Sequence, residues 1–443
     1  MSSQQYPLRQ SGIYRNLPQF APSIKGLSAI ICGASGISGF NTLRALLDSP
    51  ERWSTIYTLS RSPLPQKQLD FIEPSLRSRI KHVSVDLTQS ADQVKDSLVQ
   101  AGVQADYVFF YAYLQPSSDE SGMSTSMAQG LYDLNVPMFD NFITGLELAN
   151  IEPKRILLQT GGKNYGMHIG RVRTPVVESD PQPRHLQTNF YYAQQDRLFK
   201  FCDDHPNTKW NMIFPCGIIG TATNAQINTF YGFGAYAAIQ ARKKEPLRFG
   251  GDFDSWQFEA CHSTAILTGF LSEWAVLEET CANQAFNAQD GGGLSWDRFF
   301  SELARWYGVE KGVIGPEEDA SKFKVTKFAG GKDAPLGYGP PLTLPLTFSL
   351  KDWFSETDNK EHWKKLMASS DGQLTYDLTK DSPNVFVGDF AYLRFGTPAA
   401  NKARMFGWNG FVDSLESIFE MFQELAKMGM LPPMAVEKAR ALV

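Results

Sequence analysis

The sequence LSAIICGASGISGFNT, residues 27–42, decides the fold of this chain. Its apolar run at 27–32 predicts a buried strand, and the residues from Phe40 onward predict a helix. Between them stand Gly33, Gly36 and Gly39, spaced three and three. In a dinucleotide site the first glycine allows a tight turn, the second lets backbone N–H groups approach a pyrophosphate, and the third lets the helix pack on the strand. The order of elements therefore predicts a nucleotide-binding fold; a glycine-rich turn without a ligand is the alternative.

The phosphate contacts are expected at the start of this helix, because its unpaired N–H groups and positive dipole end attract anions. The residues concerned are Gly33, Ser35, Gly36, Ile37, Ser38 and Gly39.

The end of the second strand, 54–59, distinguishes the two dinucleotides. An NAD site usually has an acid there that accepts from the ribose hydroxyls, whereas a 2′-phosphate requires a cation. Here Ser60, Arg61 and Ser62 follow the strand, with no acid within reach. Arg61 can pair with a phosphate, and the two serines can donate to it. We therefore expect NADP(H) rather than NAD(H); the alternative is that Arg61 is an ordinary surface residue.

Further apolar runs continue the alternation of strand and helix, at 80–87, 106–113, 155–160 and 210–214. Repeated β-α-β units specify a parallel, doubly wound sheet, so the predicted fold class is α/β of the Rossmann type. The predicted organisation has three parts: an N-terminal tail, loose or wrapping, at 1–24; an NADP(H)-binding domain at 25–220, with a returning strand near 284–290; and a mainly helical substrate-binding lobe at 221–443.

The bulk composition argues against several classes of function. The 443 residues carry a net charge of −5, so no basic surface favours nucleic acid or anionic lipid. The five cysteines form no CxxC pair and the six histidines form no cluster, so we expect reduced thiols and no metal site. No apolar run is long enough to cross a bilayer, and the N-terminus lacks the apolar core of a signal peptide. We expect a cytoplasmic monomer or homodimer that acts on a small molecule.

Other strand ends are expected to line the ligand crevice. Asp86 and Leu87 follow the third strand and are expected to face the adenine; for Asp86 a plain turn is the alternative. Tyr111 and Tyr113 end the fourth strand, where they line the site unless they are core aromatics. The bulky apolar side chains beyond residue 221 are expected to be mostly core, with some of them forming the roof of an apolar pocket. The other expected contacts are Thr160, Pro215, Gly217, Ile218 and Ile219 for the cofactor, and Tyr113, Tyr165 and Phe233 for the substrate.

The chain lacks the usual YxxxK pair of a short-chain dehydrogenase, because Gln195 stands four residues after Tyr191 and Asp196 four after Tyr192. The available groups are Lys163, after the fifth strand, and a tyrosine at 189–192. Strand ends and the loops after them converge on one crevice in a doubly wound sheet, so Lys163 and Tyr191 can meet across 28 positions. A nearby ammonium is expected to lower the pKa of the phenol. A surface lysine and a core tyrosine are the alternative.

The sequences GASGISG, LQTGGKNYG and NFYYAQQD together resemble the progesterone 5β-reductase/iridoid synthase family of atypical extended short-chain dehydrogenases. The resemblance implies that Lys163 is the lysine of the family's TGxKHYxGP motif and that Tyr191 is the working tyrosine of NFYY. It also implies NADPH-dependent reduction of the C=C bond of an enone or enal. Tyr191 would stabilise the enolate oxygen, Lys163 would support it and hold the nicotinamide ribose, and the backbone at 217–219 would hold the nicotinamide carboxamide.

Several departures from the family pattern limit which of the family's properties can be expected of this chain. Asn164 replaces the motif histidine, Met167 stands where proline would be, and the end of the fourth strand lacks the plant tryptophan. The segment 310–405 is also longer and unlike the plant enzymes, so the steroid or monoterpene substrate is not expected to transfer. Three rivals stay open: direct carbonyl reduction, an isomerase or cyclase that retains NADP(H), and a non-catalytic NADP(H) sensor.

Overall fold

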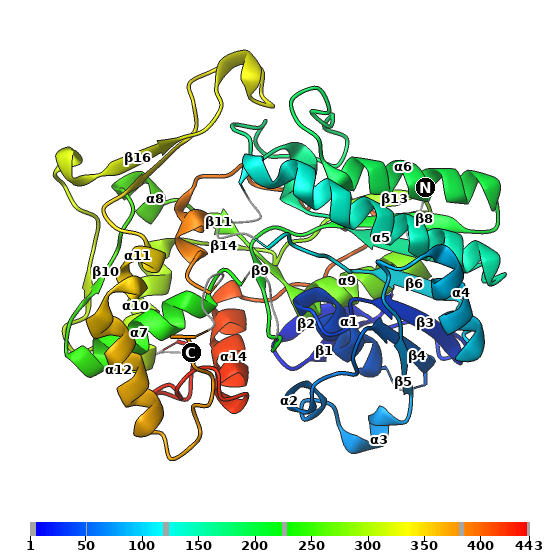
Figure 1. The fold of residues 1–443 in the computed structure, drawn as a ribbon, viewed down its shortest axis with the longest axis horizontal. Helices are drawn as coiled ribbons and strands as arrows, with labels where there is room; N and C mark the ends of the chain where they lie inside the picture. Colours follow the sequence, from blue (N-terminus) through cyan, green and yellow to red (C-terminus); the bar gives the residue numbers. More distant parts are fainter. Residues whose placement is uncertain (1–5, 50, 118–123, 224–227, 381–384, 441–443) are drawn as a thin grey trace.

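A computed structural model describes residues 6–49, 51–117, 124–223, 228–380 and 385–440. Its centre is a seven-stranded parallel sheet in the order β13-β8-β7-β6-β3-β4-β5, seen at the right of Figure 1. The strands are β3 (Leu27–Cys32), β4 (Trp53–Ser60), β5 (Ile80–Ser84), β6 (Tyr107–Phe110), β7 (Arg155–Gln159), β8 (Lys209–Phe214) and β13 (Gln284–Asn287). The predicted α/β fold with a doubly wound parallel sheet is confirmed, including the late strand that returns to its edge.

The central strands β3 and β6 are largely apolar and buried because helices cover both faces of the sheet. Along β3, Ile30 packs in one core and Ile31 in the other. The first core is completed by α4 (Ala91–Gln100), α5 (Ala128–Leu148) and α6 (Phe190–Asp204), and the second by α1 (Ile37–Leu47) and α9 (Ala265–Leu277). Helix α9 therefore belongs to the nucleotide-binding lobe, although the sequence assigned residues beyond 221, apart from one strand, to the other lobe.

The second lobe lies at the left of Figure 1 and is mainly helical, with several two-stranded sheets. Its helices include α7 (Tyr231–Lys243), α8 (Phe253–Trp256), α10 (Trp296–Tyr307), α11 (Leu350–Ser355), α12 (Thr357–Ala368) and α14 (Ser414–Lys427). Its strand pairs are β10 (Leu247–Arg248) with β15 (Val313–Ile314), β11 (Ala260–Cys261) with β14 (Gly293–Leu294), and β16 (Lys324–Lys327) with β17 (Thr343–Leu346). The β16–β17 hairpin projects from this lobe (Figure 1).

The junction between the lobes is tied by both main chain and side chains. Strand β9 (Ile218–Ile219), just after the sheet strand β8, pairs with β12 (Ser263–Thr264), which leads into α9. Arg44 of α1 forms an ion pair with Glu424 of α14 at 2.6 Å. The remaining helices are short: α2 (Gln66–Leu69), α3 (Pro74–Arg77), α13 (Asn401–Met405), and the 3₁₀ turns η1 (Thr125–Met127), η2 (Gly162–Tyr165), η3 (Glu279–Cys281), η4 (Ala320–Lys322), η5 (Gly331–Asp333) and η6 (Gly388–Tyr392).

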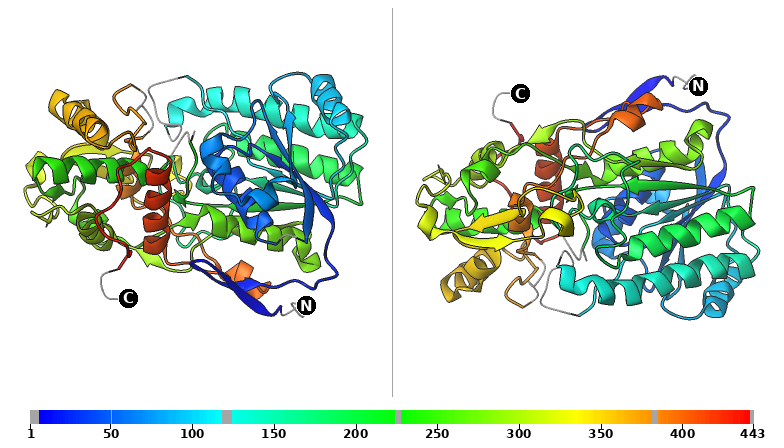
Figure 2. Two further views of the ribbon diagram at one scale, coloured as in Figure 1. Left: turned by 90° about the horizontal axis from the view of Figure 1, so that it is seen from below. Right: turned by 90° about the horizontal axis from the view of Figure 1, so that it is seen from above.

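The N-terminal segment wraps the nucleotide-binding lobe as a hairpin of β1 (Leu8–Ser11) and β2 (Tyr14–Pro18); residues 1–5 lie outside the described part. Tyr14 packs edge-on against Phe270 of α9, with 5.8 Å between ring centroids. Arg15 and Phe411 exchange backbone hydrogen bonds of 2.9 and 3.1 Å. Figure 2 shows this blue segment running along the outside of the nucleotide-binding lobe as far as the junction.

Candidate active site

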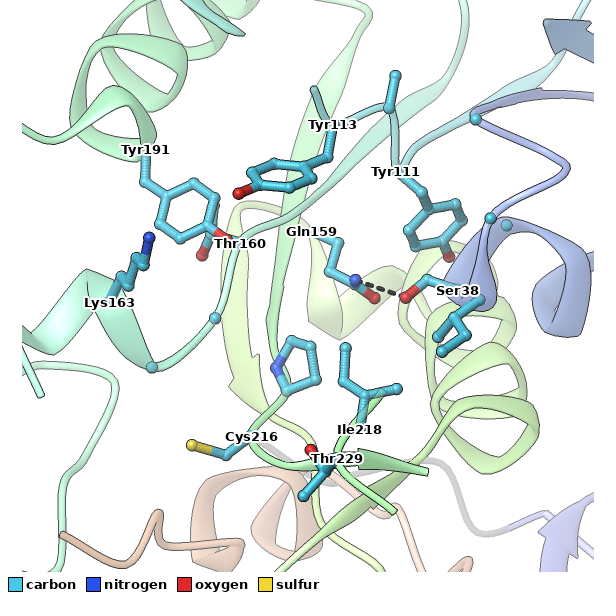
Figure 3. A pocket seen from close by; sticks show the side chains of 18 of the residues that line it. Ser38, Tyr111, Tyr113, Gln159, Thr160, Lys163, Tyr191, Cys216, Ile218 and Thr229 are labelled. Carbon is cyan, nitrogen blue, oxygen red and sulfur yellow. Dashed lines mark hydrogen bonds between the residues drawn. The ribbon is translucent and has the colours of Figure 1, made fainter. Parts of the chain in front are cut away.

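A cavity of about 640 Å³ lies where the carboxyl ends of the sheet strands meet the second lobe. In a doubly wound sheet this edge is where ligands bind. Figure 3 shows its inner part, with side chains from α1, β7, α6 and the segments after β6 and β8 pointing inward. The sequence-predicted residues that line it are Gly33, Ser35, Gly36, Ile37, Ser38, Gly39, Ser60, Arg61, Ser62, Asp86, Leu87, Tyr111, Tyr113, Thr160, Lys163, Tyr191, Pro215, Gly217 and Ile218.

The glycine turn has the close backbone approaches that its spacing predicts. Gly33 adopts a φ of 75°, and a Cβ there would lie 2.8 Å from the backbone nitrogen of Ala112. A Cβ on Gly39 would lie 2.3 Å from the carbonyl oxygen of Gly33. These two positions need glycine because the segment after β6 passes close to the turn and α1 packs directly on it.

The N-terminus of α1 is open toward the cavity. Gly36 precedes the helix without a side-chain cap, and the first turn of the helix carries no acid. A Cβ on Gly36 would contact only the Gly33 oxygen, at 3.4 Å, so the space in front of the turn is unfilled. Free N–H groups and the positive end of the helix dipole thus face a space that a pyrophosphate fits.

The opposite end of the cavity has the polar groups expected around an adenosine phosphate. The loop after β4 is held by hydrogen bonds from Ser60 Oγ to the Ser62 oxygen (2.7 Å) and from Ser84 Oγ to the Arg61 oxygen (3.3 Å). The Arg61 side chain is exposed. Asp86 accepts from the Thr88 hydroxyl, and this bond, with help from Arg61, lowers the pKa of the carboxyl group. Asp86 is the one acid among the described residues of the cavity wall.

The middle of the cavity is organised by contacts between strand ends and α1. Gln159, at the end of β7, donates to the hydroxyl of Ser38 at 2.7 Å, as the dashed line in Figure 3 shows. The Tyr111 hydroxyl accepts from Thr42 of α1 at 3.0 Å. The Tyr113 ring lies 6.0 Å from that of Phe190, next to Tyr191. Tyr111 and Tyr113 thus line the cavity instead of serving only as core.

Lys163 and Tyr191 face the same cavity, and Asn189 fixes the two segments that carry them. The Asn189 side chain caps α6 by accepting from the Tyr191 N–H at 3.0 Å, and it donates to the Lys163 carbonyl oxygen at 2.8 Å. The Tyr191 hydroxyl lies 3.8 Å from the Cβ position of Gly161, two residues before Lys163. In Figure 3 the Lys163 amine lies beside the Tyr191 ring, and the Tyr191 hydroxyl points toward Thr160.

The pKa of Tyr191 shifts in the opposite direction from the one expected beside Lys163. Burial raises the pKa of Tyr191, and the neighbouring Tyr113 and Cys216 add to the rise. The net shift is thus opposite to the lowered pKa expected for a phenol beside an ammonium, because burial disfavours the charged phenolate. Burial also lowers the pKa of Lys163, to about 8. Tyr191 is thus a neutral hydrogen-bond donor, and Lys163 changes charge in mildly alkaline solution.

Turnover should consequently fall as the pH rises through about 8. A lysine with a lowered pKa is charged below that pKa and neutral above it. The pH profile of kcat/KM for NADPH, measured from pH 6 to 10, should bend downward near that value. Lys163→Arg keeps its charge over this range and should remove the bend, while Lys163→Met should be weak at every pH. A wild-type profile that stays level through pH 8 would remove the ammonium from the mechanism.

Three expected contacts lie outside the cavity wall. The Tyr165 hydroxyl donates to Asn287 of β13 at 2.7 Å and the residue is buried there. Phe233 is fully buried in α7 and packs against Trp296, with 5.1 Å between ring centroids. Ile219 is buried in the β9–β12 pair. All three residues are buried against other parts of the protein, so their side chains do not reach the cavity in this structure.

Other lining residues were not foreseen. Gln159, Cys216 and His262 line the cavity, as do Phe258 of the second lobe and the segment 387–398 around η6. Gln159 directly precedes Thr160, which was an expected cofactor contact, so its position at the end of the same strand could have predicted it. The segment 387–398 reaches the cavity only through long-range packing, such as the Phe390–Phe328 ring contact at 6.2 Å. No local sequence pattern predicts that this segment lines the cavity.

The cysteines are all free thiols, as expected. Within the described residues there is no cluster of three His, Cys, Asp or Glu side chains suited to a metal ion. Those residues also include no helix that is both long and apolar enough to span a bilayer.

The parallel sheet, the glycine turn and a lysine and tyrosine on one cavity define the class: a Rossmann-fold enzyme of the short-chain dehydrogenase/reductase superfamily. The model of the PRISE-like Rossmann-fold domain matches residues 29–328, or 300 of 443 residues. The chain belongs to this family.

Relatives agree with this membership. The short chain dehydrogenase gsfE of Penicillium aethiopicum is 27% identical over 410 residues, which are 91% of this chain and 99% of that protein. The (S)-8-oxocitronellyl enol synthase ISY1 of Nepeta racemosa is 27% identical over 67% of this chain and 72% of its own. The 3-oxo-Delta(4,5)-steroid 5-beta-reductase of Arabidopsis thaliana is 25% identical over 64% of this chain and 70% of its own length. The predicted resemblance is thereby confirmed at the level of the family.

Proposed function

We propose that the protein uses NADPH to reduce the activated C=C bond of an enone or enal in an apolar small molecule. The observation that carries the proposal is the neutral phenol of Tyr191 and the ammonium of Lys163 facing one cavity that also contains the glycine turn. The names of two relatives describe an enol synthase and a reductase of a 3-oxo-Delta(4,5)-steroid. Both names fit chemistry at a C=C bond conjugated to a carbonyl group.

The residues present fit NADP(H). The open N-terminus of α1 suits a pyrophosphate, and Arg61, with Ser60 and Ser62, suits a 2′-phosphate at the end of β4. The acid that an NAD site usually has at the end of β4 is missing from the described wall, where Asp86 follows β5 instead. When bound, NADPH supplies the hydride for the β-carbon of the substrate.

The chain's own residues act on the oxygen of the substrate. Tyr191 donates a hydrogen bond from its hydroxyl to the carbonyl oxygen, and this bond strengthens as negative charge develops there. Its raised pKa keeps the proton on the phenol until the oxygen becomes basic enough to take it. Lys163 stabilises the same charge from the side while it is protonated, and the surrounding apolar wall excludes water. Phe258 and Phe390 of the second lobe contribute to that wall.

The rivals make different products. Direct carbonyl reduction by the same pair gives an allylic alcohol, and an isomerase or cyclase consumes no NADPH. A sensor would bind NADP(H) without turnover; Tyr191→Phe would then leave the cellular function intact, whereas Arg61→Ala would abolish it. The test is NADPH oxidation with 2-cyclohexenone, an enal, a saturated ketone and an aldehyde, followed by product analysis. Saturated carbonyl products support the proposal, and oxidation with only the saturated ketone and aldehyde contradicts it.

Arg61→Ala should reverse much of the preference for NADPH over NADH. Loss of a charge-assisted hydrogen bond to the 2′-phosphate should raise the KM for NADPH about 10- to 100-fold, with little change for NADH. Steady-state kinetics with both nucleotides measure this change. Arg173→Ala, at an exposed arginine outside the cavity wall, is the matched control and should change neither value. Equal losses with both nucleotides would contradict a specific role for Arg61.

A further inference from the structure

His262 is a buried imidazole in the cavity wall that has no role in the mechanism proposed above. It precedes β12, is 5% exposed, and lies with 5.2 Å between its ring centroid and that of Phe230. Burial lowers the pKa of His262 to about 4, so the ring is neutral at physiological pH. A neutral imidazole has one N–H donor and one acceptor nitrogen, and both need partners when buried.

The ring lacks such partners within the part of the chain that the structure describes. Its Nδ1 atom is buried without a hydrogen bond. Its Cδ2–Nε2 edge faces Gly217, where a Cβ would lie 3.0 Å from Cδ2 and 3.8 Å from Nε2. An unpaired N–H costs more than an unpaired lone pair, so we assign the proton to Nε2, the nitrogen beside the cavity-lining Gly217. The ring thus presents a donor on the cavity side without an acceptor from the protein.

The neighbouring backbone is already hydrogen-bonded, which matters because residues 217–219 were expected to hold the nicotinamide carboxamide. Ser263 Oγ accepts from the Cys216 N–H at 2.8 Å and donates to the Cys216 oxygen at 3.0 Å. The Ser263 N–H donates to the Gly217 oxygen at 3.4 Å. Ile219 is buried in the strand pair. Within 217–219, the Gly217 oxygen accepts from Ser263, and Ile218 and Ile219 pair with β12, so this stretch is partly engaged within the protein.

His262 lies in the wall of the cavity that Tyr191 and Lys163 also line, and Cys216 and Gly217 connect the two places. Cys216 is close enough to Tyr191 to raise the pKa of the phenol, and Gly217 is the next residue after Cys216. His262 contacts Gly217 from the other side. Figure 3 shows Cys216 and Ile218 across the cavity from Tyr191, and His262 lies against Gly217, between those two residues in the chain.

We propose that His262 donates a hydrogen bond from Nε2 to the carboxamide oxygen of the nicotinamide and so fixes the orientation of that ring. The proposal rests on NADP(H) binding as proposed above. It does not depend on which bond of the substrate is reduced. His262 then takes over the part that the backbone at 217–219 was expected to play.

The test compares NADPH with 2′-phospho-ADP-ribose, which has the same nucleotide and 2′-phosphate but no nicotinamide. Isothermal titration calorimetry of His262→Phe should show the Kd for NADPH raised about fivefold to tenfold, the range of one neutral hydrogen bond. The Kd for 2′-phospho-ADP-ribose should be unchanged. His262→Gln, whose amide N–H can reach a similar place, should recover most of the loss, and His185→Phe, at an exposed histidine, should match the wild type.

Two outcomes would overturn the proposal. An unchanged Kd for NADPH, even with a raised KM for 2-cyclohexenone, would assign His262 to the substrate or to packing. Equal losses for NADPH and 2′-phospho-ADP-ribose would show that the variant disturbs the whole cleft. Failure of the proposed function looks different: the wild type would then bind neither nucleotide, or would bind NADPH without oxidising it in the presence of any enone or enal.

Discussion

Tyr191→Phe is expected to lower the kcat of NADPH-dependent enone reduction about 10²- to 10³-fold, the usual effect of removing one donor to a developing oxyanion. The phenol faces the cavity as a neutral donor, because burial holds its pKa above the ordinary value for tyrosine. Removal of the hydroxyl leaves the ring in place, so packing against Phe190 should survive. Steady-state kinetics with 2-cyclohexenone and calorimetric titration with NADPH measure the two properties separately.

A matched variant controls for the loss of a tyrosine hydroxyl as such. Tyr57 is buried in β4 outside the cavity, and its hydroxyl donates to the Gly102 oxygen at 3.4 Å. Tyr57→Phe should keep kcat within about twofold, as expected for a site that makes no contact with reacting atoms. If Tyr191→Phe retained wild-type kcat, Tyr191 would have no part in the chemistry. If it lost NADPH binding instead, its role would be in the cofactor site.

Gly39→Ala should be the second severe change, acting on both stability and cofactor binding. The new methyl group would lie 2.3 Å from the Gly33 oxygen and 2.9 Å from the Ala34 Cα, so α1 must move away from the turn. Such overpacking against backbone should reduce the free energy of unfolding by about 1–3 kcal/mol. The displaced helix N-terminus should also bind NADPH too weakly for saturation. Denaturant unfolding and calorimetric titration measure the two effects.

Gly36→Ala is the matched comparison within the same turn. Gly36 has an ordinary extended backbone, with φ −78° and ψ 171°, and its methyl group would contact only the Gly33 oxygen at 3.4 Å. Stability should therefore be unchanged or slightly higher, since alanine restricts the unfolded chain. NADPH binding should still weaken, because the methyl group enters the space in front of the helix. Full NADPH affinity in Gly36→Ala would show that the pyrophosphate does not lie there.

Much of the fold follows from local sequence. Runs such as 27–32 and 155–159 are apolar without alternation because both sheet faces are covered, and this pattern is visible in the letters. The N-terminal hairpin was not anticipated, because its short strands are stabilised by distant partners such as Phe411. Helix α9 was assigned to the wrong lobe for a similar reason: its contact with α1 joins segments more than 200 positions apart, and no local pattern reports it.

The site was predictable where chemistry depends on residue type at strand ends. The glycines, Arg61 and Lys163 belong to this group, and the family resemblance singled out Tyr191. The direction of the Tyr191 pKa shift was not predictable, because burial depends on neighbours such as Tyr113 and Leu131 that only the folded chain brings together. Phe233 and Tyr165 were misplaced since aromatic side chains suit a core as well as a pocket. His262 has no sequence signal at all; only its missing partners in the folded chain make it a candidate.

The central claim is that Tyr191 and Lys163 polarise the oxygen of an enone, so that the reduction occurs at its β-carbon. The most direct measurement uses NADPH deuterated at the transferable position with 2-cyclohexenone, followed by NMR of the product. We expect cyclohexanone with deuterium at C3. Deuterium on the carbinol carbon of 2-cyclohexenol, or NADPH binding with no transfer of deuterium to any enone or enal, would contradict it.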